Sequence, residues 1–206
     1  MATGSNRIYL VSRSPRRREL LKQIGIVPEP LLLRSDLLRP ADVDETPYSG
    51  EPVEDYVRRI ARAKAETGWA HLLQRRLPKL PILAADTTIG LDGEIIGKPD
   101  DREHAEAILR RLSGRMHEVL TCVTMVQDEH IEERLAVSRV EFKALSEDEI
   151  KRYAASGEPF DKAGAYAIQG LAAIFVARLE GSYSGVMGLP LFETAQLLEL
   201  FGVEHL

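Results

Sequence analysis

The sequence holds a single cysteine, Cys122, so no disulfide can form within the chain. Because Cys122 lies in the apolar, β-branched run 119–126, we interpret it as a small buried hydrophobic residue. No run of apolar residues approaches the roughly 20 that a membrane-spanning helix needs. Residues 1–6 also lack the apolar core of a secretory signal. We therefore expect a cytoplasmic protein with no membrane partner.

Positive charge is not in excess either. The net charge is -5, whereas proteins that coat nucleic acids carry a basic surface that neutralises phosphates. This balance argues against a stable nucleic-acid partner. Apolar residues make up 44% of the chain and charged residues 29%, which excludes a disordered or fibrous protein. A length of 206 residues allows one domain, or two small lobes that share a cleft.

Short apolar strands alternate with amphipathic helices along the chain. Strands are predicted at 8–12, 80–85, 87–91, 94–96, 118–126, 131–145 and 172–179. Helices are predicted from Pro15, from Pro52 to just before Gly68, through 105–112, from the capping box of Ser146 and Glu149 to near Gly157, and from about Pro190. The two longest strands should pair antiparallel. This order predicts an α/β fold, a mixed twisted sheet flanked by helices, with a cleft between two lobes.

The first predicted helix begins with three arginines, Arg16, Arg17 and Arg18, after Ser14 as the expected N-cap. A helix N-terminus carries about half a positive charge, so each cation there costs about 0.3–1 kcal/mol unless an anion is bound. A phosphate would reverse that cost. Arg17 shares a face with the apolar residues and should point into the fold or its cleft, whereas Arg18 should face solvent. The alternative is a solvated basic face with one partly buried arginine.

Lys64 follows the apolar stripe of the second predicted helix, after Val57, Ile60 and Ala61. A lysine at a core-facing position either reaches into a site or packs its stem while the ammonium reaches solvent near the helix end. The sequence leaves both interpretations open.

Asp86 is the best single candidate for chemistry. It is predicted to end an apolar strand, and in open α/β sheets ligands bind beyond the carboxyl ends of strands. Asp92-Gly93 favours a type I′ hairpin turn, in which Thr87 faces Lys98 and Asp86 becomes a close neighbour of Lys98. An ordinary ion pair is the alternative. A metal-chelated polyanion, however, needs both carboxylates and cations, and polar loops supply more of each at Asp44, Glu45, Asp161 and Lys162.

Several familiar motifs are absent. Residues 93–98 come one residue short of a P-loop and are followed by proline where Ser or Thr should bind magnesium. His117-Glu118 lacks the second histidine of a zinc protease helix. Neither G-x-S-x-G nor paired C-x-x-C occurs. These absences exclude Walker NTPases, zincins, serine hydrolases and zinc fingers.

The remaining motifs, taken in order, resemble those of the Maf proteins, a family of nucleotide pyrophosphatases once called septum-formation proteins. The resemblance covers nearly the whole chain. It is carried by Ser12-Arg13-Ser14-Pro15-Arg16-Arg17, Asp44-Glu45-Thr46, Ala61-Arg62-Ala63-Lys64-Ala65, Ala85-Asp86-Thr87, Gly97-Lys98-Pro99, Leu112-Ser113-Gly114, Ser156-Gly157-Glu158-Pro159, Asp161-Lys162-Ala163-Gly164-Ala165-Tyr166, Ile168-Gln169-Gly170 and Gly188-Leu189-Pro190-Leu191.

The resemblance implies a single α/β domain over residues 1–206, of the Maf and inosine triphosphate pyrophosphatase type. It implies a divalent metal cofactor, Mg²⁺ or Mn²⁺, and a nucleotide substrate that is cleaved between the α- and β-phosphates to a monophosphate and pyrophosphate. A homodimer and a role in septum formation are implied by the resemblance alone.

The resemblance also implies roles for individual residues. Asp86 would be the general base or a metal-linked carboxylate, and we favour a metal-activated water that Asp86 orients and deprotonates. Metal ligands would be Asp44, Glu45, Asp86 and Asp161. The phosphates would be held by Ser14, Arg16, Arg17, Lys64, Lys98 and Lys162.

Three positions, Arg16, Thr87 and Gln169, distinguish two subgroups of the family. This chain resembles the subgroup that hydrolyses dTTP and UTP, since the subgroup that acts on 7-methyl-GTP typically has Trp, Gln and Glu there. An amide such as Gln169 matches the donor and acceptor edge of uracil or thymine. Modified pyrimidine nucleotides, such as 5-methyl-UTP, are further candidate substrates.

Two alternative functions remain at this stage. The first is a nucleotide-sensing or nucleic-acid-binding regulator of cell division that uses the same cleft without turnover. The second is a phosphomonoesterase, which would release orthophosphate in place of pyrophosphate.

Overall fold

The structure is a computed structural model that describes residues 5–34 and 41–206. Its strands are β1 (Arg7–Val11), β2 (Val27–Pro30), β3 (Ile82–Leu91), β4 (Glu94–Ile96), β5 (Met116–Gln127), β6 (His130–Phe142) and β7 (Val176–Glu180). Its α-helices are α1 (Pro15–Gln23), α2 (Val53–Gln74), α3 (Arg102–Leu112), α4 (Glu147–Ala155), α5 (Tyr183–Val186) and α6 (Leu191–Leu200). Short 3₁₀ helices are η1 (Glu158–Asp161), η2 (Ala163–Ala165) and η3 (Leu171–Phe175). Within these described ranges, no helix is long and apolar enough to cross a membrane.

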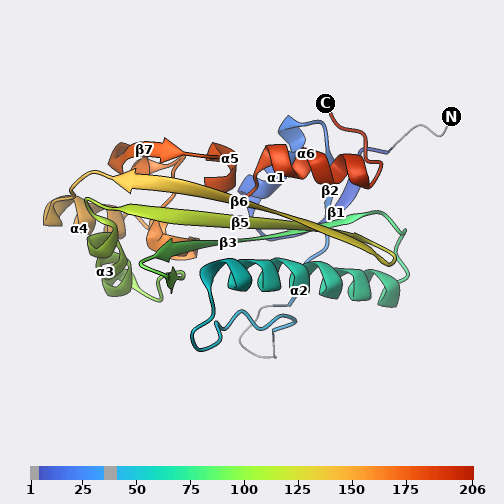
Figure 1. Ribbon diagram of the computed structural model, residues 1–206, viewed down its shortest axis with the longest axis horizontal. Coiled ribbons are helices and arrows are strands. Elements are labelled where there is room, and N and C mark those ends of the chain that lie inside the picture. Colours follow the sequence, from blue (N-terminus) through green and yellow to red (C-terminus); the bar gives the residue numbers. More distant parts are fainter. Residues whose placement is uncertain (1–4, 35–40) are drawn as a thin grey trace.

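Seven strands form one mixed sheet in the order β2-β1-β3-β5-β6-β7, with β4 beside β3. β1 runs parallel to β2 and β3, whereas β3, β5, β6 and β7 pair antiparallel in succession. In Figure 1, α2 runs along one face of the sheet, α1 and α6 lie over the other, and α3 and α4 sit together at one end. The predicted mixed α/β sheet flanked by helices is therefore confirmed.

The central strand β3 has two different partners along one edge. β1 pairs with its first residues, up to Val11 opposite Ala84, and β4 pairs with its last residues, from Ile89 opposite Ile96. Between them, over 85–88, no described strand pairs with this edge of β3, whereas β5 follows the other edge throughout. An opening in the sheet edge therefore lies beside the middle of β3.

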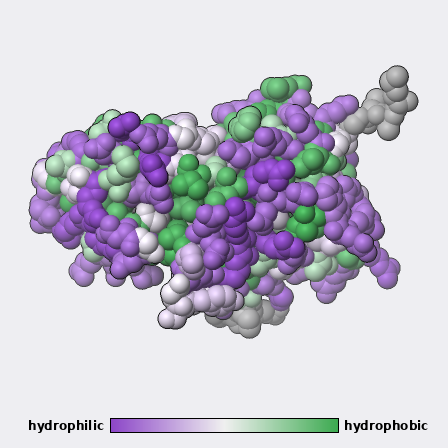
Figure 2. Space-filling model, viewed as in Figure 1, coloured by the Kyte–Doolittle hydropathy of each residue, from purple (hydrophilic) through white to green (hydrophobic). Residues whose placement is uncertain are grey.

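Apolar residues of β3 join different core clusters before and after this opening. Leu83 packs with residues of α1 and α6, and Ala84 packs with residues of α2. Ile89 packs with residues of α3 and α4. In Figure 2 the visible face is largely hydrophilic, with hydrophobic side chains gathered near its middle. Polar side chains of β3 thus lie where the cores of the two ends meet.

Several local predictions are confirmed. Asp92 and Gly93 have φ values of 54° and 79° and join β3 to β4 with Leu91 opposite Glu94. β5 and β6 pair antiparallel, and Ser146 with Glu149 forms a reciprocal capping box. Cys122 is fully buried, as expected of a small hydrophobic residue.

The predicted end of the second helix at Gly68 was wrong, because α2 continues to Gln74. Gly68 lies where the helix crosses β1, and a Cβ atom there would stand 2.6 Å from Val11 Cγ2. The glycine permits a close approach of helix and sheet, and the apolar stripe goes on to the fully buried Leu72.

Two strand predictions also needed correction, and one strand was missed. Asp86 does not end its strand, since β3 runs through it to Leu91, and the strand that ends there is the neighbouring β1. Residues 171–175 form η3, with the Ala173 N–H bonded to the Gly170 carbonyl, and β7 begins only at Val176. β2 was not predicted, because its two prolines are typical only of an edge strand.

Candidate functional site: a charged pocket beside strand β3

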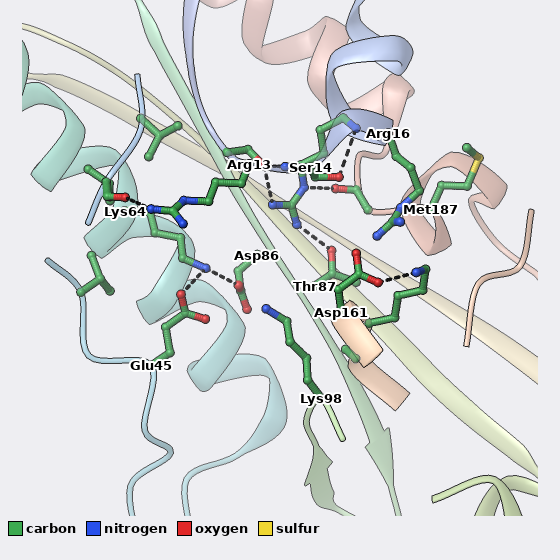
Figure 3. Close-up of a pocket in the computed structure, with 18 of the residues that line it drawn as sticks. Arg13, Ser14, Arg16, Glu45, Lys64, Asp86, Thr87, Lys98, Asp161 and Met187 are labelled. Carbon is green, nitrogen blue, oxygen red and sulfur yellow. Dashed lines mark hydrogen bonds and ion pairs between the residues drawn. The ribbon is translucent and has the colours of Figure 1, made fainter. Parts of the chain in front are cut away.

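A pocket of about 980 Å³ opens beside the middle of β3 (Figure 3). Its walls come from segments that are far apart in the sequence. Every residue that the sequence analysis assigned to the site lines this pocket: Ser14, Arg16, Arg17, Asp44, Glu45, Lys64, Asp86, Thr87, Lys98, Asp161, Lys162 and Gln169. The fold therefore brings the whole predicted set together.

The loop from β1 to α1 forms one wall. Ser14 is the N-cap, since its Oγ accepts a hydrogen bond from the Arg17 backbone N–H at 3.4 Å, and Pro15 takes the first helical position. No acidic residue lies in the first turn of α1. Arg18 faces solvent as expected, and Arg16 lines the pocket. With no acidic residue of its own, this turn presents positive charge to the pocket, which suits an anion.

Arg17 points into the fold, as its helical face predicted. Its Nε donates to the Gly188 carbonyl at 2.7 Å, one terminal nitrogen donates to Thr87 Oγ1 at 3.1 Å, and the other donates to Ser12 Oγ at 3.3 Å. Burial lowers the pKa of the guanidinium, and the negative charge of Asp86 opposes that effect. Because arginine stays protonated in proteins, Arg17 is a fixed cation that ties the pocket walls together.

Lys64 follows the buried stripe of α2 directly into the pocket. Ile60 and Ala61, one turn earlier, are fully buried. Lys64 Nζ lies 2.7 Å from Asp86 Oδ1 and 3.0 Å from Glu45 Oε1, and 16% of its side chain is exposed. The ammonium therefore bridges two carboxylates instead of reaching solvent at the helix end.

The segment that carries Glu45 is tied to α2. Tyr56 Oη donates to the Glu45 carbonyl at 3.0 Å, and Arg59 donates to the Thr46 carbonyl at 3.1 Å. Asp44 Oδ1 accepts the Thr46 backbone N–H at 2.9 Å, and hydrogen bonds from Thr46 lower the pKa of Asp44. Asp44 is thus an ionised residue bonded to its own loop, whereas Glu45 contacts the helix lysine.

The opposite wall carries both signs of charge. Asp161 pairs with Lys162, whose Nζ also donates to the Glu158 carbonyl at 2.7 Å. Burial favours the neutral form of Asp161, but the hydrogen bond from Lys162 keeps its pKa below the ordinary value. In Figure 3 the Lys98 side chain extends towards Asp86. Over residues 5–34 and 41–206, Lys98 forms no ion pair, so its charge is available to a ligand.

Of the three positions expected to distinguish substrates, Thr87 is partly exposed, Gln169 is exposed, and both line the pocket. Arg16 lines the same pocket as these two residues and as the phosphate-binding candidates. A base and a phosphate tail can therefore be accommodated in one continuous cavity.

The acidic residues fit a divalent metal that is held partly by substrate. Asp86 and Glu45 place one oxygen each within 3.0 Å of the same ammonium, so two hard oxygen donors converge. No group of three or more His, Cys, Asp or Glu side chains with metal-binding geometry occurs among the described residues. Mg²⁺ is commonly bound through one or two carboxylates, water and substrate phosphates, so this donor set is compatible with it.

Sequence reasoning did not assign some residues of the pocket region to the site. Arg13 lines the pocket and donates to the Leu33 carbonyl at 3.0 Å. Thr121 bonds to Thr87 from the neighbouring strand, and only the sheet register reveals it. Gly188, which accepts the Arg17 hydrogen bond, lay in a family motif but had been given no role.

The fold and the site define an α/β protein with a large, charged pocket suited to a polyanionic ligand. The chain belongs to the Maf family: residues 7–201 match the family model described as Maf-like protein. A dTTP/UTP pyrophosphatase of Nitrosomonas europaea is 59% identical over 97% of each chain. One of Aromatoleum aromaticum is 58% identical over 95% of this chain and 96% of its own. The solved structure of the Staphylococcus aureus Ham1 protein aligns with 16% identity and a TM-score of 0.49, covering 95% of this chain and 97% of its own.

Proposed function

We propose that this protein is a dTTP/UTP pyrophosphatase, which hydrolyses the nucleoside triphosphate to its monophosphate and pyrophosphate. The relatives that are 58–59% identical over nearly the full length carry that name. The structural observation that supports it is the convergence of Asp86, Lys64, Lys98 and Arg17 on one pocket.

The cations of the pocket bind the phosphates in this proposal. Arg16 and Lys98 interact with phosphoryl oxygens directly, and the N-terminal turn of α1, with Ser14 as its cap, adds backbone dipoles. Lys64 and Lys162 already hold carboxylates, so they share their charge between those carboxylates and the substrate. Arg17 contributes charge while it fixes the walls.

Asp86 accepts the proton of the attacking water. Lys64 Nζ, 2.7 Å from Asp86 Oδ1, holds that carboxylate in place at the pocket, which suits a proton acceptor. The water oxygen forms a bond to the α-phosphorus. The bond from that phosphorus to the α–β bridging oxygen breaks, and pyrophosphate leaves with the electron pair of that bond. A divalent cation, Mg²⁺ or Mn²⁺, would be held by Asp86 and Glu45 together with phosphate oxygens. Once bound, it would lower the pKa of water and neutralise developing charge, with Asp44 and Asp161 as further carboxylates at the pocket.

The base is selected by Arg16, Thr87 and Gln169. The Gln169 amide offers both a donor and an acceptor, as uracil and thymine do on their exposed edge. A cationic 7-methylguanine would favour an aromatic platform and a carboxylate, and neither type of side chain stands at these three positions.

The chain is further proposed to be one domain over residues 1–206, with two lobes that meet at Asp86. The separate core clusters on either side of that residue support this division. A cytoplasmic location follows from the proposed substrates, and a homodimer without a stable nucleic-acid partner is proposed from the family.

One assay tests the function. The protein is incubated with dTTP, UTP or 7-methyl-GTP and Mg²⁺ or Mn²⁺, and the phosphate product is identified. Pyrophosphate from dTTP and UTP is expected. Orthophosphate would indicate a phosphomonoesterase, and binding without turnover would indicate a nucleotide sensor or regulator.

A further inference from the structure

Two threonine hydroxyls face each other across β3 and β5 beneath the pocket. Thr87 and Thr121 are paired in the sheet register, and their Oγ1 atoms lie 3.0 Å apart. Thr121 Oγ1 also donates to the Gly185 carbonyl at 2.8 Å. Thr121 is 1% exposed and does not line the pocket. Any effect of Thr121 on a ligand must therefore act through its neighbours.

The hydrogen atoms of this network can be assigned from its partners. A hydroxyl has one hydrogen to donate and can accept two hydrogen bonds. Because Thr121 gives its hydrogen to the Gly185 carbonyl, it must accept from Thr87. Thr87 in turn accepts from the Arg17 guanidinium at 3.1 Å. The direction of every bond is fixed, and the Thr87 oxygen has one acceptor position left for a ligand.

The same network holds a wall of the pocket. Arg17 Nε bonds to the Gly188 carbonyl, so the hydrogen bonds close a ring from Arg17 through both threonines to the turn between Gly185 and Gly188. Residues 186–188 of that turn line the pocket. Thr121 thus anchors this wall at one end while Arg17 anchors it at the other.

We propose that Thr121 is a positioning residue for base selection, which makes Thr87 a hydrogen-bond acceptor towards the substrate and holds residues 186–188 in place. This inference rests on the proposed function, since it concerns the nucleotide that the same pocket takes.

The fixed polarity of Thr87 has a chemical consequence. An oxygen that can only accept favours a base with a ring N–H at that position, as uracil and thymine have at N3. Cytosine has a bare acceptor nitrogen at N3 and would place two acceptors against each other. A site that leaves such groups unpaired rejects the analogue strongly. Thr121 would therefore favour thymine and uracil over cytosine without contacting the base.

The test compares binding of dTMP and dCMP, which report base selection without hydrolysis, with the kinetics of dTTP, UTP and CTP. Thr121→Val removes the hydroxyl, so Thr87 is free to donate. We expect roughly tenfold weaker dTMP binding and a roughly tenfold smaller preference for dTMP over dCMP. KM for dTTP should rise in the same proportion, with kcat changed much less. Thr121→Ser keeps the hydroxyl and should restore the wild-type preference.

The matched control is Thr124→Val, the same change at a fully buried position on the same strand. The Thr124 hydroxyl makes a long, weak contact with Cys122 Sγ at 4.0 Å. Thr124→Val should leave both dTMP binding and the preference for dTMP over dCMP unchanged. If Thr121→Val does not fold, Thr121→Cys, with a weak S–H donor, should shift the preference in the same direction. An unchanged dTMP to dCMP preference in the folded variant, or an equal change in Thr124→Val, would overturn the proposal. Wild-type protein that releases no pyrophosphate would refute the proposed function instead, and the monophosphate binding would still report on Thr121.

Discussion

Lys64 Nζ lies 2.7 Å from Asp86 Oδ1 and is shared with Glu45 at 3.0 Å. A single ammonium thus offsets the repulsion of two carboxylates that come from different segments of the chain. Asp86 is 7% exposed, so its pairing with Lys64 lies largely away from solvent, whereas Glu45 is 46% exposed. The arrangement holds the two carboxylates close together, as the proposed metal site requires.

Asp86→Asn should abolish most turnover while leaving the fold intact. Asparagine keeps the shape and can still accept a hydrogen bond from Lys64, but it cannot accept a proton. We expect kcat for pyrophosphate release to fall by about 10²- to 10⁴-fold, with little change in the thermal midpoint. Asp128→Asn, at an exposed ion pair with Lys79, is the control. Activity within tenfold of wild type would refute the proposed role of Asp86.

Lys64→Met should make the protein less stable and more responsive to magnesium. Without the ammonium, the carboxylates of Asp86 and Glu45 lose the cation that both contact. Glu45 is 46% exposed, so water screens part of the repulsion, and we expect a loss of roughly 2 kcal/mol in the free energy of unfolding. Mg²⁺ bound between the carboxylates would restore that loss. Thermal denaturation with and without Mg²⁺ should therefore give a larger rise in midpoint for the variant than for wild type. Equal rises would contradict the metal position.

Lys98→Gln should weaken substrate binding without altering stability. Lys98 lines the pocket and forms no ion pair with any residue the structure describes, so its removal breaks no folded-state contact of that kind. A charged hydrogen bond to phosphate is worth about 1.5–3 kcal/mol, so KM for dTTP should rise at least roughly tenfold. Steady-state kinetics and thermal unfolding measure the two effects. Lys22→Gln, on the exposed side of α1, should change neither.

Features set by near neighbours in the sequence could be predicted well. The cap at Ser14 and the turn at Asp92-Gly93 depend on a few adjacent residues, and both are present as expected. Helical spacing predicted that Arg17 points inward, and it left Lys64 open between the site and solvent; the structure places both side chains at the pocket. The members of the pocket were therefore identifiable, with the help of the family motifs, before the chain pairing was known.

Features set by distant partners could not be predicted. Asp86 was expected at a strand end, but the end in question belongs to β1, and only sheet pairing reveals that. The link from Thr121 to Thr87 depends on the register of β5 against β3. In the sequence, Thr121 is an ordinary β-branched residue within an apolar run. The proposed positioning role of Thr121 depends on its being paired with Thr87 in the sheet, which the sequence around Thr121 does not indicate.

His117 should make stability fall as the solution becomes acidic. Its ring is buried beside Phe142, with Nε2 2.9 Å from Tyr166 Oη. Burial lowers the pKa of His117 from 6.5 to about 4. Below pH 6.5 the unfolded chain binds a proton that the folded chain does not, so stability is retained above that pH and lost progressively towards pH 4.

Urea denaturation at several pH values measures this effect. Between pH 7.5 and pH 5 the wild-type protein should lose roughly 2 kcal/mol through His117. His117→Gln cannot be protonated, so its free energy of unfolding should fall less over the same interval, whatever its value at pH 7.5. Parallel pH profiles for the two proteins would contradict the prediction, because they would show that His117 binds its proton equally well in the folded and the unfolded chain.

Gly68→Ala should destabilise the protein, although alanine is the better helix former by about 1 kcal/mol. The new Cβ would stand 2.6 Å from Val11 Cγ2 and 3.5 Å from Ile82 Cγ2. Valine is stiff about χ1, so α2 must move away from β1, and overpacking of this kind costs about 1–3 kcal/mol. Val11→Ala removes the clashing methyl group. In a double-mutant cycle measured by urea denaturation, Gly68→Ala should therefore be less harmful in the Val11→Ala background than in wild type. If Gly68→Ala alone stabilised the protein, the helix propensity would outweigh the close packing, and Gly68 would not be needed for the approach of α2 to the sheet.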